Sequence, residues 1–216
     1  MQTLTPLEPG YYYHIYNRGV NRTNLFIEDR NFAYFMQLYA KHITPVADTF
    51  AYCLMPNHFH FLVRIRTDRL DQPDRFCGET DRLGFGNRVG LNKLDRRAVS
   101  QAFNNWLNAY AKAINKAYNR TGSLFQHHFG RLLVTSDRYF AALIHYIHYN
   151  PQKHGFVKDF REWHYSSYHA LLSDKPTRLE RAMVLNWFGG LQGFQKFHTM
   201  MVDESSISEF IGDDNE

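Results

Sequence analysis

The chain has 216 residues, of which 44% are hydrophobic, so it can build one sizeable core but is short for two domains. Its formal charge of +4 understates how basic the body is, because residues 203–216 hold six of the 21 acidic residues and none of the 25 Lys and Arg. The two cysteines, Cys53 and Cys77, are far apart in sequence, so neither a disulfide framework nor a cysteine zinc site is implied, and no apolar run is long enough to cross a membrane.

The N-terminal part of the chain predicts a strand followed by a helix. Residues 11–17 are dense in β-forming side chains and stop at Arg18-Gly19, which indicates a strand and then a turn. Asp29 is the expected N-cap of a helix that Pro45 ends. The apolar residues of this helix recur at the spacing of one buried face: Phe32, Phe35, Met36 and Tyr39.

Two histidines alternate with large apolar residues just after Pro56-Asn57. That dipeptide predicts a tight turn, so residues 49–54 and 58–65 are expected to pair as antiparallel strands. Residues i and i+2 of a strand share a face, so His58 and His60 point one way while the apolar side chains between them point into a core. Two imidazoles held side by side can share one metal ion. The alternative is a pair of half-buried histidines hydrogen-bonded to their neighbours.

The middle of the chain completes a recognisable order of elements. Residues 67–97 are polar with little periodicity and are expected to form a long loop. A helix is predicted over 98–118, where the apolar side chains form a stripe that includes Tyr110, and a fourth strand over 128–135. The resulting order, β-α-β-β-α-β, is that of a ferredoxin-like α+β fold with an antiparallel sheet.

One additional helix follows the fourth strand, opening at Ser136 or Asp137 and ending at Pro151. At 100° per residue, Tyr146 and Asn150 lie one turn apart on a flank away from the apolar face. The other interpretation of Tyr146 is an aromatic residue at the edge of the core. The apolar face is predicted to contain Phe140, Leu143, Ile144 and Ile147, and the flank also holds Tyr139.

We expect residues 1–172 to form one domain, with 67–97 as an insert, followed by a helical appendage over 173–202 and a disordered acidic tail over 203–216. A basic body rich in Phe, Tyr and Trp suits phosphate contacts and base stacking on a nucleic acid, although many basic proteins bind none. No signal-peptide pattern is present, so a cytoplasmic protein without a membrane partner is expected.

Four stretches resemble the single-tyrosine HUH transposases, in particular the REP-associated tyrosine transposases. Residues 54–63 contain two histidines that flank an apolar residue, as on the family's central strand. Residues 13–19 resemble its first strand, and residues 145–155 resemble the helix that carries its nucleophile. Residues 163–168, Trp-His-Tyr-Ser-Ser-Tyr, resemble the tail motif of the REP-associated branch.

The resemblance implies roles for four residues. Tyr146 would be the nucleophile, and His58, His60 and Asn150 would be ligands of a divalent metal ion. The chemistry of this set agrees, because a neutral amide oxygen is a hard ligand that suits Mg²⁺ or Mn²⁺, whereas a structural zinc site normally completes four nitrogen or sulfur ligands.

The implied activity is that of a metal-dependent single-stranded DNA endonuclease and strand transferase. Attack by the Tyr146 hydroxyl would form a 5′-phosphotyrosine intermediate on hairpin-flanked DNA, of the REP-like or transposon-end type, and would require no nucleotide cofactor. Because the reference pKa of tyrosine is about 10, the ion or a neighbouring cation has to help it ionise, and Lys153 and His154 are candidates. A homodimer is left open.

Two other functions compete with this one. A ferredoxin-like sheet with exposed aromatic residues can also bind single-stranded nucleic acid without cutting it, as RNA-recognition folds do. A metal-dependent hydrolase, in which water attacks, is the third. A covalent bond between protein and DNA separates the first function from both others.

Overall fold

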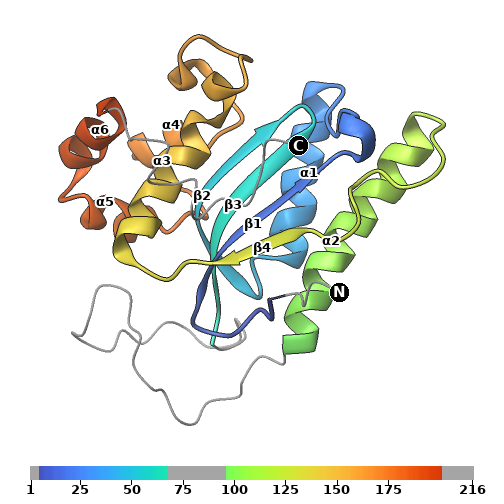
Figure 1. Ribbon diagram of the computed structural model, residues 1–216, viewed down its shortest axis with the longest axis horizontal. Helices are drawn as coiled ribbons and strands as arrows, with labels where there is room; N and C mark the ends of the chain where they lie inside the picture. The colour runs from blue at the N-terminus through green and yellow to red at the C-terminus, as the bar shows by residue number, and fades with distance from the viewer. Residues whose placement is uncertain (1–4, 68–95, 201–216) are drawn as a thin grey trace.

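A four-stranded antiparallel sheet forms the centre of the computed structural model, which describes residues 5–67 and 96–200. The strands lie in the order β2-β3-β1-β4 (Figure 1), and the connections run β-α-β-β-α-β, so the predicted ferredoxin-like α+β fold is confirmed. The strand bounds differ from those predicted by a few residues: β1 Tyr12–Arg18, β2 Ala47–Met55, β3 His58–Ile65 and β4 Gly130–Leu133.

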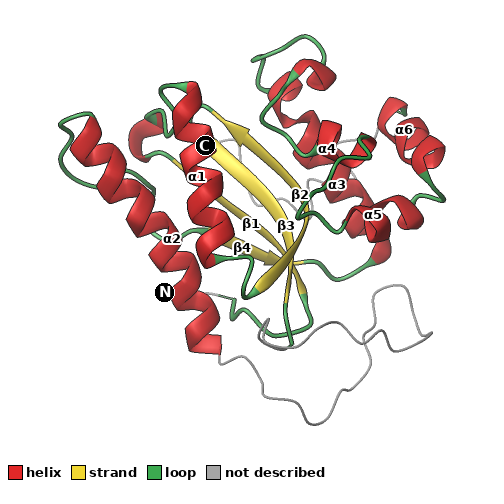
Figure 2. Cartoon of the chain, turned by 180° about the vertical axis from the view of Figure 1, so that it is seen from behind, coloured by secondary structure: helices red, strands yellow, loops and turns green. Residues whose placement is uncertain are grey.

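Two helices cover one face of the sheet. They are α1, Asp29–His42, and α2, Arg96–Ala117, and they lie in front of the sheet in Figure 2. The predicted alternation of β3 is confirmed on this side, since Phe59, Phe61 and Val63 are fully buried in the core shared with these helices. The opposite face of β3 is thereby left for its two histidines.

A second core lies on that opposite face, beneath helix α3, Asp137–Lys153. This helix packs on β2 and β3, and most of its residues are buried. The prediction of a single buried face on this helix was therefore wrong, because apolar residues from further along the chain enclose its other side. The enclosing elements are η2 Phe160–Glu162, α4 Tyr168–Leu172, α5 Arg181–Trp187 and α6 Leu191–Thr199, grouped around α3 in Figure 1.

The start of α1 corrects a predicted cap by one residue. The N-cap is Glu28 rather than Asp29, and it forms a capping box in which its side chain accepts the backbone N–H of Asn31. The Asn31 side chain accepts the backbone N–H of Glu28 in return, at 2.9 Å. The helix ends at His42, before Pro45.

The end of α3 lies beyond the predicted stop at Pro151. The helix continues to Lys153, because the loss of one helical hydrogen bond at proline is outweighed by burial of the helix on both sides. It ends where Gly155 adopts a φ of 72°, with the N–H of Phe156 bonded to the carbonyl of Pro151 and that of Gly155 to the carbonyl of Gln152. This is a Schellman motif, for which glycine is the usual residue.

The Trp-His-Tyr-Ser-Ser-Tyr motif seals the outer edge of the sheet. The N–H of Leu54 donates to the Tyr165 carbonyl, and the N–H of Ser167 donates to the Tyr52 carbonyl, both at 2.9 Å. The indole of Trp163 donates to the Leu54 carbonyl at 2.9 Å. The open backbone groups of β2 are thus paired, which is how many proteins protect an edge strand.

Two predicted segments fall largely outside the described residues, namely the 67–97 insert and the 203–216 tail, and the boundary after residue 172 stays a prediction. A short 3-10 turn, η1 Val20–Arg22, follows β1. Among the described residues, no helix is both long and apolar enough to span a membrane.

A chain of side-chain hydrogen bonds ties the edge motif through α3 to α6. The hydroxyl of Ser167 accepts the Tyr52 N–H at 2.9 Å and donates to Nε2 of His148 at 2.7 Å. Nδ1 of His148 then donates to Nε2 of His198, and Nδ1 of His198 donates to the Phe194 carbonyl, each at 2.9 Å. Both imidazoles are neutral at neutral pH, because burial lowers the pKa of each ring.

Acid is predicted to destabilise the protein through His198. Burial lowers the pKa of this side chain from 6.5 to about 4, whereas unfolding restores the ordinary value. The unfolded state therefore binds more protons below pH 6.5, and the free energy of unfolding should fall by about 2 kcal/mol between pH 7.5 and pH 5 from this group. Urea denaturation at the two pH values measures the loss.

The variant His198→Gln should lose less stability between the two pH values than the wild type. His164→Gln, at an exposed position, is the matched control and should behave as the wild type does. An equal acid loss in all three proteins would contradict the assignment.

Candidate active site

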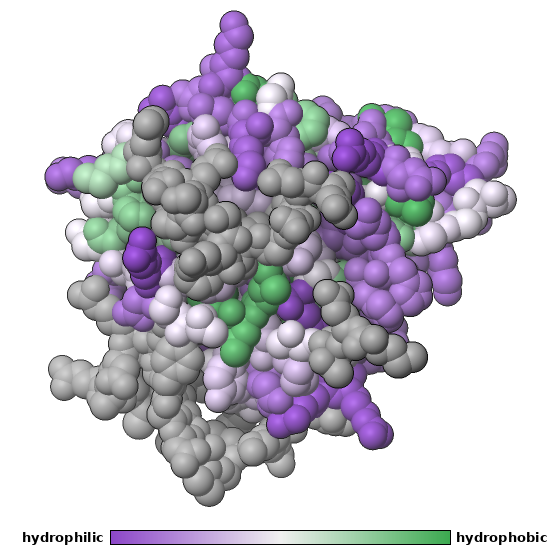
Figure 3. All heavy atoms as spheres, viewed as in Figure 1, coloured by the Kyte–Doolittle hydropathy of each residue, from purple (hydrophilic) through white to green (hydrophobic). Residues whose placement is uncertain are grey.

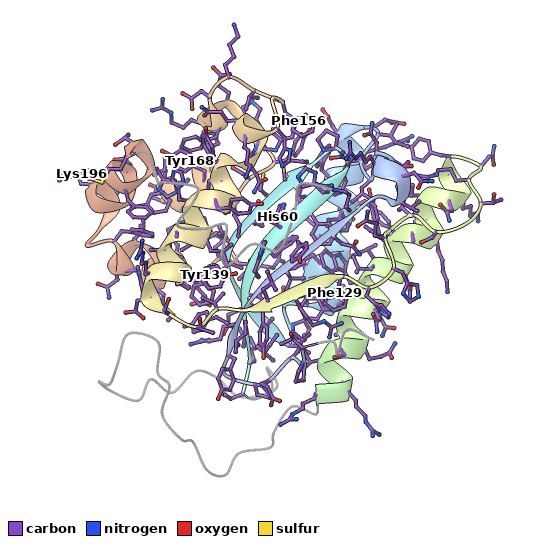
Figure 4. All side chains as sticks on the ribbon, in the orientation of Figure 1. His60, Phe129, Tyr139, Phe156, Tyr168 and Lys196 are labelled. Carbon is purple, nitrogen blue, oxygen red and sulfur yellow. The ribbon has the colours of Figure 1, made fainter. Side chains whose placement is uncertain are left out.

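The two histidines of β3 occupy the sheet face that α3 covers, and Figure 4 shows His60 there beside this helix. His58 and His60 are 4% and 1% exposed, and their ring centroids are 5.3 Å apart with perpendicular planes. The hairpin turn before them is anchored, because the Asn57 carbonyl accepts the Gly19 N–H at 2.8 Å and the Pro56 carbonyl accepts two more N–H groups. The predicted pairing of two histidines on one face is confirmed in geometry.

A neighbouring side chain orients each of the two rings. Nδ1 of His58 lies 2.6 Å from the amide oxygen of Asn57, which can only accept, so Nδ1 carries the proton. Nδ1 of His60 lies 2.9 Å from Nε2 of His14 on β1, and the tautomer decides which of the two nitrogens donates. Nε2 of His58 is therefore left with its lone pair, the arrangement that second-shell partners impose on metal-binding histidines, and Nε2 of His60 has the same arrangement in the tautomer whose Nδ1 donates.

Both imidazoles are held in the neutral form. Burial is the main cause of the lowered pKa of His58 and of the strongly lowered pKa of His60. Positive or protonatable neighbours add to the effect, among them Arg18 and His154. A ring that resists protonation keeps its lone pair available for a cation at neutral pH.

Helix α3 presents a matching row of side chains to this pair. Tyr146, Asn150 and His154 are spaced by four residues and so lie along one side of the helix. The Tyr146 ring meets His60 edge to face at 5.6 Å between centroids, and the His154 ring meets His58 at 4.7 Å. Asn150, one turn from each, therefore lies opposite the histidine pair.

Asn150 supplies an oxygen that no protein group satisfies. Its Nδ2 donates to the Tyr146 carbonyl at 3.1 Å, while its Oδ1 is buried without a hydrogen-bond partner. Nε2 of His58 and Nε2 of His60 are likewise buried without a hydrogen-bond partner. Such atoms are costly unless a ligand completes them.

The three unpartnered atoms are two imidazole nitrogens and one amide oxygen, which are ligand types that a divalent cation accepts. Among the described residues, no three His, Cys, Asp or Glu side chains are grouped to hold a metal ion, so a third protein ligand has to be of another kind. The Asn150 amide is of that kind, and oxygen ligands suit Mg²⁺ or Mn²⁺.

The structure corrects what was predicted for the tyrosines of α3. Tyr146 is only 2% exposed and does not lie on an open flank. Tyr149, which the same 100° count places opposite the buried face, is half-buried and stacks on His145 at 5.6 Å between centroids. The C-terminal elements that enclose α3 account for both differences. Tyr110 is a core residue as predicted, fully buried with its hydroxyl bonded to the Leu25 carbonyl.

The sequence alone did not single out His14 and Asn57. Asn57 was assigned only to the turn, although it sits next to His58. His14 lies on the same side of β1 as Tyr16 and Arg18, and only the pairing of β1 with β3 brings it to His60. Lys153, named as a cation near the nucleophile, does lie there, with Nζ 5.4 Å from the centre of the Tyr146 ring.

Comparison with known proteins agrees with the resemblance found in the sequence. No family model matches the chain. A protein of Haemophilus influenzae named as a REP-associated tyrosine transposase is 27% identical over 122 residues, which are 56% of this chain and 59% of the relative. The match thus spans well under two thirds of that relative's length.

A solved structure described as a REP-associated tyrosine transposase bound to a REP hairpin shares the fold. The TM-score is 0.54 at 16% identity, over 82% of this chain and 88% of the other. Both comparisons point to the same kind of protein, so the similarity to REP-associated tyrosine transposases is confirmed.

We predict that His58→Ala or His60→Ala abolishes binding of Mn²⁺, measured by isothermal titration. Loss of a second-shell partner alone costs about 10–100-fold in metal affinity, and loss of a ligand should cost at least as much. His164→Ala, at an exposed position, is the control and should bind as the wild type does. Circular dichroism should show the fold retained. Unchanged Mn²⁺ affinity in His60→Ala would rule out this site.

Proposed function

We propose that this chain, whose sequence and fold relate it to REP-associated tyrosine transposases, cuts and rejoins single-stranded DNA beside a hairpin. One observation carries the proposal, namely that a tyrosine ring meets the ring of a histidine whose Nε2 has no protein partner. The centroids of Tyr146 and His60 are 5.6 Å apart. A potential nucleophile therefore stands at the edge of a donor set suited to a divalent cation.

In the proposed reaction, the hydroxyl oxygen of Tyr146 bonds to phosphorus and the bond from phosphorus to the 3′ oxygen breaks. The phenol loses its proton, the leaving oxygen gains one, and the products are a 5′-phosphotyrosine and a free 3′ hydroxyl. Rejoining is the reverse attack by a 3′ hydroxyl, so no nucleotide cofactor is consumed. An Mg²⁺ or Mn²⁺ ion held by His58, His60 and Asn150 would absorb the negative charge that develops on the phosphate.

Residues of this chain favour and orient the nucleophile. The ammonium group of Lys153 lies 5.4 Å from the Tyr146 ring centre, so its positive charge would lie near the phenolate that forms during attack. Edge contacts to His60 and His14 hold the Tyr146 ring in one orientation, and the bond from the Asn150 amide to the Tyr146 backbone carbonyl orients the Asn150 side chain. Such fixed geometry is what makes an in-line attack effective.

Burial of Tyr146 adds a condition to the proposal. Because the side chain is 2% exposed, a phosphodiester reaches it only when the structure around this part of α3 opens locally. A closed resting state would protect the phenol until DNA is bound, as lids and loops do in other enzymes.

The proposed partner is hairpin DNA with an unpaired flank. The structural neighbour is described as bound to a REP hairpin, and we extend that partner to this chain on the strength of the shared fold and the basic composition. A homodimer remains a prediction.

The Tyr146→Phe variant tests the proposal. It should keep the fold, Mn²⁺ binding and DNA binding, but form no covalent adduct, because only the hydroxyl is removed. The measurement is a denaturing gel after incubation with labelled, hairpin-flanked single-stranded DNA and Mn²⁺. Tyr149→Phe and Tyr110→Phe are the controls and should still form the adduct.

Three results would overturn this assignment. An adduct formed by Tyr146→Phe would make another tyrosine the nucleophile. Cleavage without an adduct in any of the proteins would favour attack by water and hence the hydrolase. Binding without cleavage would favour the non-catalytic nucleic-acid-binding module.

DNA affinity should fall steeply with salt if Lys and Arg contact phosphates. The expected slope of the logarithm of the binding constant against the logarithm of the salt concentration is about −0.7 per contact on a single strand. Fluorescence anisotropy over a series of salt concentrations measures this slope. An affinity independent of salt would contradict phosphate contacts.

A further inference from the structure

The half of the sheet that α3 does not cover carries an aromatic ring beside the histidine pair. Helix α3 packs on β2 and β3, and Figure 1 shows no described helix in front of β1 and β4. Tyr16 lies on this part of β1, opposite His60 in the register, and is half-buried. On the face seen in Figure 3, the described residues are mostly hydrophilic, with small apolar patches among them.

Gly130 on the edge strand makes room for this ring. Tyr16 and Gly130 are paired across β1 and β4, and a Cβ atom at Gly130 would overlap the Tyr16 ring carbons. Gly130 is not among the glycines with positive φ, so the backbone itself does not call for glycine there. The ring therefore lies across the edge strand, and the missing side chain is what permits it.

Three rings share nearly one orientation at this place. The Tyr16 plane is tilted by 21° from that of His60 and by 32° from that of His14, with centroids 6.0 Å and 4.8 Å away. His14 and His60 are themselves within 20° of parallel. A planar group that stacks on Tyr16 would extend this series next to the candidate cation site.

A positive charge lies on the same side of β1. Arg18 is two residues beyond Tyr16, is paired with His58 in the register and is half-buried. Because it pairs with His58 across β1 and β3, Arg18 lies beside the candidate site. A flat aromatic surface next to a guanidinium matches an unpaired base and its phosphate.

We propose that Tyr16, laid over Gly130, is a stacking platform for an unpaired DNA base next to the phosphate that Tyr146 attacks, and that Arg18 binds the adjoining phosphate. The inference rests on the proposed function and assigns a binding subsite within it. Any base can stack on an aromatic side chain, so this subsite binds the strand without sequence preference.

The test uses DNA hairpins with an unpaired flank of mixed sequence that carries 2-aminopurine at successive positions. Tyr146→Phe is the background, so that no strand is cut. We expect quenching of the fluorescence at one or two flank positions, lost in Tyr16→Leu and kept in Tyr16→Phe. DNA affinity should fall about 5- to 150-fold in Tyr16→Leu, the range for one lost stacking contact. Tyr34→Leu, on α1 across the sheet and 38% exposed, is the matched control.

Mn²⁺ affinity shows whether Tyr16 contacts DNA or only supports the histidines of the candidate site. Tyr16→Leu should bind Mn²⁺ as the wild type does if Tyr16 contacts DNA, whereas a parallel loss of Mn²⁺ affinity would mean that the ring only holds His60 in place. Arg18→Gln should weaken DNA binding and reduce its salt slope by about one contact.

The failures of the two proposals can be told apart. If the wild type forms the covalent adduct but Tyr16→Leu binds DNA with unchanged affinity and quenching, the platform is wrong and the function stands. If no adduct forms but Tyr16→Leu loses affinity and quenching, the platform stands and the strand transferase is wrong.

Discussion

The constraint on which the rest of the structure depends is the burial of three polar atoms that no protein group satisfies: Nε2 of His58, Nε2 of His60 and Oδ1 of Asn150. Each such atom costs about 1–3 kcal/mol against folding. The surrounding structure therefore has to hold them by other means. Three features hold these atoms in place: the anchored hairpin turn, the hydrogen-bond partners of the two histidine rings, and the packing of α3 on both sides. A cation bound to all three polar atoms would remove the cost of burying them.

Two regular spacings meet at this place. The strand sets its two histidines about 7 Å apart, whereas Tyr146 and His154 are eight residues and about 12 Å apart along the chain of the helix. The ring of Tyr146 nevertheless meets His60 and the ring of His154 meets His58, because these long side chains span the difference, and Asn150 lies between them in sequence. A sheet built in the ferredoxin-like order places β3 at its centre, where one face can be given to the core and the other to the site.

Local pattern was sufficient to predict the sheet, the hairpin and the candidate residues. The alternation of histidine with phenylalanine from His58 to Phe61 indicates which face of the strand meets the core, and the resemblance added Tyr146 and Asn150. The burial of Tyr146 could not be predicted, because residues far along the chain enclose α3 and no local spacing encodes that contact. His14 was missed for a related reason, since a lone histidine on a strand becomes significant only through the register of β1 against β3.

Helix α3 is packed on both sides, and this packing limits how the helix can move. One side carries Tyr146 and Asn150, while the other is tied by His148 to Ser167 in the segment that seals β2. His148 lies on the opposite side of α3 from Tyr146. A tilt or rotation of the helix that exposes Tyr146 would therefore also strain the hydrogen bond between His148 and Ser167. Under the proposed function, the resistance to opening that DNA meets would be set in part by this bond on the other side of the helix, and a change at Ser167 would alter how readily Tyr146 becomes accessible.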